Sequence, residues 1–285
     1  MLPELGWMPR LAAALLALGL LTLLVVRAVR KDRREFSRFR RYRSTARRQA
    51  MMRRWLIESA VLFGGSSAVV LLLTWPVVTP LLGAAQVVPP IAWLRDALAG
   101  GLGIGLLIGA GVGLVLLTWL GVRGARREGG VIMLGDIAAL LPRNRPELAW
   151  GAALSVNAGI VEELLFRFAL PALLVIVTGE PVSAFLLAAL VFGALHAYQG
   201  WAGVVATTVV GLLFTVLYVA SGSIVLAMLV HALFDLRTLV VIPVAVYRVH
   251  TVPGSVRFPK PLAVATRAAT SADSAAATEA VSDQT

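Results

Sequence analysis

The sequence has no cysteine among its 285 residues, and only 14% of its residues are charged. Without cysteine, the chain can form neither a disulfide scaffold nor a zinc, haem or iron–sulfur site held by thiolates. An ordinary soluble domain carries about 25% charged residues, so the low charge content also excludes a typical water-soluble enzyme. The chain is instead 59% hydrophobic with a mean hydropathy of +0.85, which favours a membrane protein.

Acidic residues are scarce as well, with 15 of them against 26 lysines and arginines and a net charge of +11. Such an excess is typical of nucleic-acid-binding proteins. Half of the basic residues, however, lie between Arg27 and Arg54, and five arginines form a second group between Arg123 and Arg145. Positive loops beside apolar segments stay on the cytoplasmic side of a membrane. We therefore interpret segment 27–54 as a topology determinant on the lipid surface, in preference to an anionic-lipid clamp or a nucleic-acid arm, and expect no nucleic-acid partner.

The apolar segments are long enough to cross a bilayer whose hydrocarbon core is about 30 Å thick. They predict an all-α fold, a polytopic transmembrane helix bundle with its N-terminus outside and its C-terminus inside. Segment 131–141 is too short to span, and we interpret it as an interfacial helix, or as an eighth short or re-entrant segment. The expected spans number about seven: 10–28, 56–80, 98–121, 149–178, 182–198, 202–220 and 223–247.

Composition divides the chain into three expected regions. Residues 1–148 form an N-terminal membrane region with three spans and two basic cytoplasmic loops, 27–54 and 122–148. Residues 149–248 form a C-terminal membrane core. Residues 249–285 are rich in Ala, Thr and Ser and predict a disordered cytoplasmic tail.

The third expected span carries a small residue at every fourth position: Gly101, Gly105, Gly109 and Gly113. At helical spacing these glycines form one face on which another helix backbone can approach closely. We favour packing inside the bundle, with a homo-oligomer seam as the alternative.

Ionisable residues inside the spans are few, because a charged group in hydrocarbon costs several kcal/mol unless it is paired or faces a cavity. They are confined to the last four spans: Glu162, Glu163, Arg167, His196, His231, Asp235 and Arg237. The polar chemistry of the membrane region is therefore expected in the C-terminal half of the bundle.

Helical spacing sorts the first three of these residues. Glu163 and Arg167 are four apart, with the acid on the N-terminal side, which is the favoured order for an ion pair. Glu162 then faces elsewhere, because successive residues differ by about 100° around a helix. Its face carries small residues that leave room for water: Ser155, Ala158 and Gly159.

The two histidines lie on other spans. His231 and Asp235 are four apart, share one helix face and can together hold a metal ion or a water molecule. Counting from the turn near residue 179 places Glu162 and His196 at a similar depth. Counting from the turn at Ser221–Gly222 puts His231 about 10 Å shallower, a gap that either a tilt or a protrusion of the fourth and fifth spans on the outer side would close.

Three motifs occur in order on these spans: EExxxR at 162–167, FxxxH at 192–196 and HxxxD at 231–235. Together they resemble the CPBP intramembrane proteases, the group of CAAX proteases and bacteriocin-processing enzymes also called Abi, with a likeness to type II CAAX prenyl endopeptidases. The resemblance covers the core 149–248, and the N-terminal spans and the tail carry no motif of the family.

The resemblance implies hydrolysis of a peptide bond in or at the membrane. It implies that Glu162 is the general base for a water that His196 helps to position, while Glu163 and Arg167 support the site. His231 and Asp235 then complete a metal site or stabilise the oxyanion. The family is described both as metalloproteases and as metal-free glutamate proteases, so Zn²⁺ bound by Glu162, His196, His231 and Asp235 stays open beside a metal-free mechanism.

The composition, rich in Arg and Ala, is typical of a GC-rich bacterium, in which prenylated CAAX proteins are not expected. We therefore expect a peptidase of the bacterial cytoplasmic membrane, whose partners are the lipid bilayer and a membrane-associated protein or peptide substrate. The main alternative is a non-catalytic scaffold or bacteriocin-immunity protein. A proton-relay transporter and a haem protein ligated by His196 and His231 are further alternatives.

Overall fold

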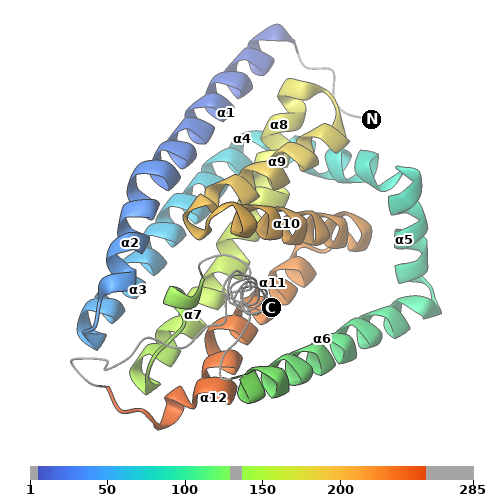
Figure 1. Ribbon diagram of the computed structural model, residues 1–285. Helices are drawn as coiled ribbons and strands as arrows, with labels where there is room; N and C mark the ends of the chain where they lie inside the picture. The colour runs from blue at the N-terminus through green and yellow to red at the C-terminus, as the bar shows by residue number, and fades with distance from the viewer. Residues whose placement is uncertain (1–5, 129–136, 255–285) are drawn as a thin grey trace, which may run out of the picture.

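The computed structural model describes residues 6–128 and 137–254, and every regular element in these two ranges is a helix. Figure 1 shows them as a bundle in which α5 and α6 lie along one edge. The α-helices in these ranges are α1 (Trp7–Arg27), α2 (Arg33–Arg41), α3 (Thr45–Ser59), α4 (Gly65–Gln86), α5 (Pro89–Ala99), α6 (Gly101–Glu128), α7 (Arg145–Glu163), α8 (Leu170–Thr178), α9 (Pro181–Leu195), α10 (Trp201–Ser221), α11 (Ile224–Leu236) and α12 (Ile242–Tyr247).

Several helical segments are long and apolar enough to cross a membrane. In the described ranges there are five: Trp7–Arg41, Thr45–Gln86, Ile108–Arg127, Trp201–Ser221 and Ile224–Tyr247. Helix α9 is apolar but shorter. The predicted class, an all-α multi-pass membrane protein, is confirmed, while the number of seven spans stays a prediction.

The basic segment 27–54, expected as a cytoplasmic loop between two spans, is helical over most of its length, and its cytoplasmic placement stays a prediction. A π-helical turn, Ala28–Asp32, joins α1 to α2, and α3 follows after a break at 42–44. Helix α2 is stable because it is amphipathic: Phe36 and Phe39 are buried while its arginines face outward. Phe39 packs on Trp55 of α3 with ring centroids 4.7 Å apart, so this aromatic pair connects α2 to α3.

The main hydrophobic core surrounds α8, whose residues from Leu170 to Val175 are all buried. Helices α1, α4 and α9 pack against α8, as Figure 1 shows. The N-terminal spans and the C-terminal half therefore share one core. Many large apolar side chains outside this core are exposed, among them Leu72 and Val115, as expected for a surface that faces lipid.

The glycine face of α6 does not pack inside the bundle as we favoured. A methyl group added at Gly105, Gly109 or Gly113 meets nothing within 4 Å, and in the described part of the chain α6 has appreciable contacts only with α5 and α12. The surroundings of Gly101 are not among those described. The packing interpretation is thus wrong for three of the four glycines, and the homo-oligomer seam stays a prediction.

Two further predictions concern residues outside the described ranges. Most of segment 131–141, the expected interfacial, short or re-entrant segment, lies there, and only a 3₁₀ turn at Ala138–Leu140 is described. Of the expected tail 249–285, the described part ends at Gly254 and includes a 3₁₀ turn, Val249–Thr251.

Candidate active site

Helices α7 and α11 approach each other closely along a line of small residues. A Cβ atom on Gly159 would lie only 2.8 Å from the Cβ of Ala232 and from the carbonyl oxygen of Met228. Gly159 therefore admits the neighbouring helix and leaves no room for water there, contrary to our expectation. Ser155 is buried and donates to the carbonyl of Gly151 on its own helix, whereas Ala158 does line a cavity as expected.

The predicted ion pair between Glu163 and Arg167 is confirmed, with 2.8 Å between Oε1 of Glu163 and Nη1 of Arg167. Both side chains are buried, so each charge depends on the other. Arg167 also donates from Nη2 to the carbonyl of Gly211 at 3.1 Å, and its guanidinium lies over the ring of Phe192. The pair begins where α7 gives way to a π-helical turn, Leu164–Ala169, a local form frequent at functional sites.

The imidazole of His231 lies between the two adjacent glutamates. Its Nδ1 is 2.7 Å from Oε1 of Glu163, and its Nε2 is 3.9 Å from Oε2 of Glu162. Nε2 is also 3.8 Å from Oδ2 of Asp235, so the predicted shared face of His231 and Asp235 is confirmed. Glu162 and Glu163 do face different directions, but each of them faces a different nitrogen of the His231 ring. The close crossing of α7 and α11 removes the difference in depth that we expected for His231.

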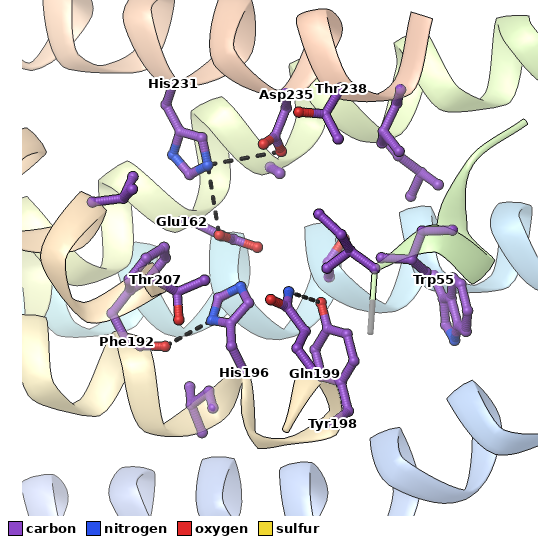
Figure 2. Close-up of a pocket in the computed structure, with 18 of the residues that line it drawn as sticks. Trp55, Glu162, Phe192, His196, Tyr198, Gln199, Thr207, His231, Asp235 and Thr238 are labelled. Atoms are coloured by element: carbon purple, nitrogen blue, oxygen red, sulfur yellow. Dashed lines mark hydrogen bonds and ion pairs between the residues drawn. The ribbon is translucent and has the colours of Figure 1, made fainter. Parts of the chain in front are cut away.

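His196 ends α9 and faces the same cavity from the other side. Its Nδ1 is 2.8 Å from the carbonyl oxygen of Phe192, and since a carbonyl can only accept, Nδ1 carries the proton. Nε2 of a neutral ring is then an acceptor. Figure 2 shows the carboxylate of Glu162 between His196 and His231, with Asp235 beside His231. The geometry thus brings together all four predicted site residues.

All four residues line one cavity of about 580 Å³, a volume typical of small-molecule sites. Part of its wall comes from α1 to α3, which we had not connected with the site. The one available signal was the presence of Phe36 and Trp55 among the arginines of segment 27–54. The wall residues from this part of the chain include Leu24, Arg27, Asp32, Phe36, Met52 and Trp55.

The side chains in the cavity are of the types that bind zinc, two imidazoles and two carboxylates. Hydrogen bonds at both Nδ1 atoms orient the rings of His196 and His231, as is usual for ligating histidines. Nevertheless, among the described residues no three His, Asp or Glu side chains are placed so that they could hold a metal ion. A zinc site at these residues therefore stays a prediction.

The comparison with protein-family models finds a match over the segment that contains these residues. The family model described as type II CAAX prenyl endopeptidase Rce1-like matches residues 144–237. Residues 144–237 are thus similar to this family, and we call them the Rce1-like domain below. It begins at Asn144, the N-cap of α7, and ends just after α11, so it contains the whole set Glu162, His196, His231 and Asp235. No curated protein and no solved structure matches the chain significantly.

A second buried ion pair, which sequence reasoning missed, ties the Rce1-like domain to the N-terminal region. Nε of Arg48 on α3 is 3.0 Å from Oε2 of Glu147 in the first turn of α7, and both side chains are completely buried. Arg48 further donates to the carbonyls of Ala139 and Leu141. We had assigned Arg48 to the lipid surface with its neighbours, and the 99 residues that separate it from Glu147 hide the contact in the sequence.

Proposed function

We propose that this protein is an intramembrane endopeptidase that hydrolyses a peptide bond of a membrane-associated protein or peptide by means of a glutamate-activated water. One observation carries the proposal: within an Rce1-like domain, the carboxylate of Glu162 faces a cavity of about 580 Å³ between His196 and His231. A carboxylate flanked by two oriented imidazoles is equipped to bind a water molecule and take its proton.

The hydrogen-bond pattern supports Glu162 as the base. A bound water has two protons to donate, and Glu162 accepts one while Nε2 of His196 or His231 accepts the other. When the water oxygen attacks the carbonyl carbon, a C–O bond forms, its proton moves to Glu162, and the carbonyl electron pair moves onto the oxygen. Collapse of this intermediate breaks the C–N bond, and Glu162 returns the proton to the leaving nitrogen.

Glu163 and Arg167 act through His231. Because Oε1 of Glu163 lies near both Arg167 and Nδ1 of His231, the buried charge pair fixes the tautomer and orientation of that ring. Asp235 lies 3.8 Å from Nε2 of the same ring, where it helps to hold the water on the Glu162 side.

The zinc ion that the sequence left open remains a prediction for the set Glu162, His196, His231 and Asp235. Elemental analysis of purified, active protein decides it. Stoichiometric zinc, with activity lost on chelation and restored by zinc, would support it. Full activity without a stoichiometric metal would contradict it.

The expected location is the cytoplasmic membrane of a bacterium, with the N-terminus outside and the C-terminus inside. The exposed arginines of α2 support this orientation, because a basic helix next to a span favours the cytoplasmic face. Tagging each terminus and measuring its accessibility to a membrane-impermeant reagent in spheroplasts tests it, since only the N-terminal tag should react.

The decisive experiment is Glu162→Gln in purified protein reconstituted with a model membrane peptide. We expect the cleavage rate to fall by a factor of about 10² to 10⁴, the usual effect of removing a general base. Glu180→Gln is the matched control, because Glu180 is an exposed carboxylate in the turn before α9. Unchanged cleavage by Glu162→Gln would refute the mechanism. A folded wild-type protein that cleaves no membrane peptide would favour the scaffold or bacteriocin-immunity alternative.

A further inference from the structure

Helix α2 has one face of apolar side chains and another of arginines. Phe36 is buried, lines the cavity and packs on Tyr198 with ring centroids 5.1 Å apart. The other face is exposed and borders a surface hollow lined by five residues, which we call the arginine face: Arg33, Arg34, Ser37, Arg38 and Arg41. Because the same helix supplies part of the cavity wall, a partner bound to the arginine face lies close to the candidate active site.

The arginine face has no carboxylate to balance its charge. Among the described residues, none of its four arginines forms an ion pair. Arg34 and Arg38 are four apart, a spacing at which like charges destabilise a helix, so an anionic partner would relieve a repulsion. Other basic residues at the ends of α1, α2 and α3 are paired, in one network of three cations and three carboxylates: Arg27, Lys31, Arg54, Asp32, Glu35 and Glu58.

The length of the first helical segment carries the arginine face away from the lipid. Segment Trp7–Arg41 is helical throughout, and Figure 1 shows α2 in line with α1. Its 35 residues extend over about 50 Å, whereas a bilayer with its headgroups is about 40–45 Å thick. Trp7 is exposed, as is common for a tryptophan at a membrane interface, and with Trp7 at one interface the end of α2 projects beyond the other, even at a tilt of about 20°. A lipid surface therefore reaches only the beginning of this face, which favours a polypeptide partner.

The spacing of the arginines suits an extended acidic segment. A carboxylate can accept two parallel hydrogen bonds from one guanidinium group, which makes it a strong partner for arginine. Arg34 and Arg38 are about 6 Å apart along the helix axis, and alternate side chains of an extended peptide are about 7 Å apart. Successive acidic side chains can therefore meet successive arginines. A helix with its side chains is about 10–12 Å wide, so a few extended residues lead from the cavity around α2 to this face.

We propose that the arginine face of α2 binds an acidic segment of the polypeptide substrate, several residues away from the bond that is cleaved. This inference rests on the proposed peptidase function. The acidic segment lies outside the cavity and the scissile bond lies inside it, so the arginine face adds to affinity and leaves the chemical step unchanged. Because the face is exposed to water, its attraction is screened by salt: the Debye length is about 10 Å in 0.1 M salt and about 3 Å in 1 M salt.

The test compares two model membrane peptides with the same scissile sequence, cleaved by the protein in nanodiscs of zwitterionic lipid. One peptide carries four glutamates about eight residues from the scissile bond, a stretch that reaches about 26 Å when extended, and the other carries four glutamines there. In about 0.1 M salt we expect the KM of the glutamate peptide to be lower by a factor of about 3 to 10, with the same kcat for both. In about 1 M salt the two peptides should behave alike.

Variants of α2 locate the effect. Arg34→Gln with Arg38→Gln should raise the KM of the glutamate peptide to near that of the glutamine peptide, whose own cleavage should not change. Arg34→Lys with Arg38→Lys keeps both charges and should keep most of the preference. The matched control is Arg123→Gln with Arg127→Gln, which removes two exposed arginines at the same spacing on α6 and should change neither KM. Most basic residues of segment 27–54 remain in the first variant, so the protein should keep its orientation in the membrane.

The outcomes distinguish this inference from the proposed function. Equal KM values for the two peptides in the wild type, or a preference that persists in Arg34→Gln with Arg38→Gln, would overturn the role of the arginine face and leave the peptidase standing. An effect of that variant only in nanodiscs with anionic lipid, and equal for both peptides, would assign the face to lipid and also overturn the proposal. If the folded wild type cleaves neither peptide, the proposed function fails instead. The affinities of the two peptides for Glu162→Gln protein then still test the face, and the glutamate peptide should bind more tightly.

Discussion

Two buried arginine–glutamate pairs in this molecule have almost the same internal geometry and different surroundings. In both pairs the side chains are fully buried, with N–O distances of 3.0 Å for Arg48–Glu147 and 2.8 Å for Arg167–Glu163. The other hydrogen bonds of the first pair go to the backbone: Arg48 donates to two carbonyls, and Glu147 accepts from a main-chain N–H. In the second pair, Oε1 of Glu163 also forms a hydrogen bond with Nδ1 of His231.

The difference shows that a buried ion pair takes its role from its remaining hydrogen-bonding groups. Where these groups meet only the backbone, as around Arg48, the pair joins two segments and stabilises them. Where one of them meets a titratable ring in a cavity, the same charges orient that ring. Breaking each pair separately should therefore change stability in both cases and chemistry in only one.

The largest effect is expected when an arginine is removed alone. Arg48→Met and Arg167→Met each leave a buried glutamate without its partner, which should lower the free energy of unfolding by about 3–5 kcal/mol. Replacing both members by apolar residues, as in Arg48→Met with Glu147→Leu, should restore much of that stability. Denaturant titrations in detergent measure both results. If the double variant is no more stable than Arg48→Met alone, the pair Arg48–Glu147 has a role other than joining the two segments.

The next effect concerns activity and separates the two pairs. Glu163→Gln removes the charge that holds His231 and should lower the cleavage rate about 10- to 100-fold per folded molecule. Glu147→Gln makes the same chemical change in the pair Arg48–Glu147 and should leave the rate per folded molecule close to that of the wild type. Rates are normalised to the folded fraction in each sample. Equal losses in both variants would contradict the distinction.

A smaller effect is expected from Gly159, the glycine that lets the pair Glu163–Arg167 reach His231. Gly159→Ala forces a methyl group against Ala232 and should destabilise the protein by about 1–3 kcal/mol, with a loss of activity. Gly105→Ala is its control, because that methyl group would meet nothing within 4 Å. The control should be neutral, or more stable by up to about 1 kcal/mol, since alanine favours a helix. An active, fully stable Gly159→Ala would show that the close crossing is not required.

The smallest effect comes from a carboxylate that is exposed. Glu180 caps α9 by accepting the backbone N–H groups of Val182 and Ser183, and these bonds hold the pKa of Glu180 below its ordinary value. A lowered pKa means that the stabilisation is complete above the ordinary value, about 4.3, and is lost as the pH falls through the lowered one. At neutral pH, Glu180→Ala should lower the Tm by no more than about 4 °C. Its difference from the wild type should shrink in acid, and a difference that grows there would contradict the sign.

What the sequence predicted well depends on short spacing. The pair Glu163–Arg167 and the pair His231–Asp235 are each four residues apart on one helix, and the helix alone places them together. The membrane class followed from long apolar segments in the same local way. The association of the three motifs in one site came from the family resemblance, since spacing on separate helices does not fix how those helices cross.

What the sequence missed depends on contacts between distant segments. The bond between Glu163 and His231 spans 68 residues, and only the close approach at Gly159 makes it reachable. The sequence does not distinguish Arg48 from the exposed arginines around it, because its buried partner Glu147 lies 99 residues away in the chain.

The cavity also has a consequence for how this protein can diversify. The residues that we propose carry the chemistry lie in the Rce1-like domain, while Leu24, Phe36 and Trp55 of the cavity wall come from the first sixty residues. The proposed reactive groups and part of the cavity wall are thus encoded in separate segments of the sequence. Exchanging the first three helices would therefore change the shape of the cavity while leaving Glu162, His196 and His231 in place.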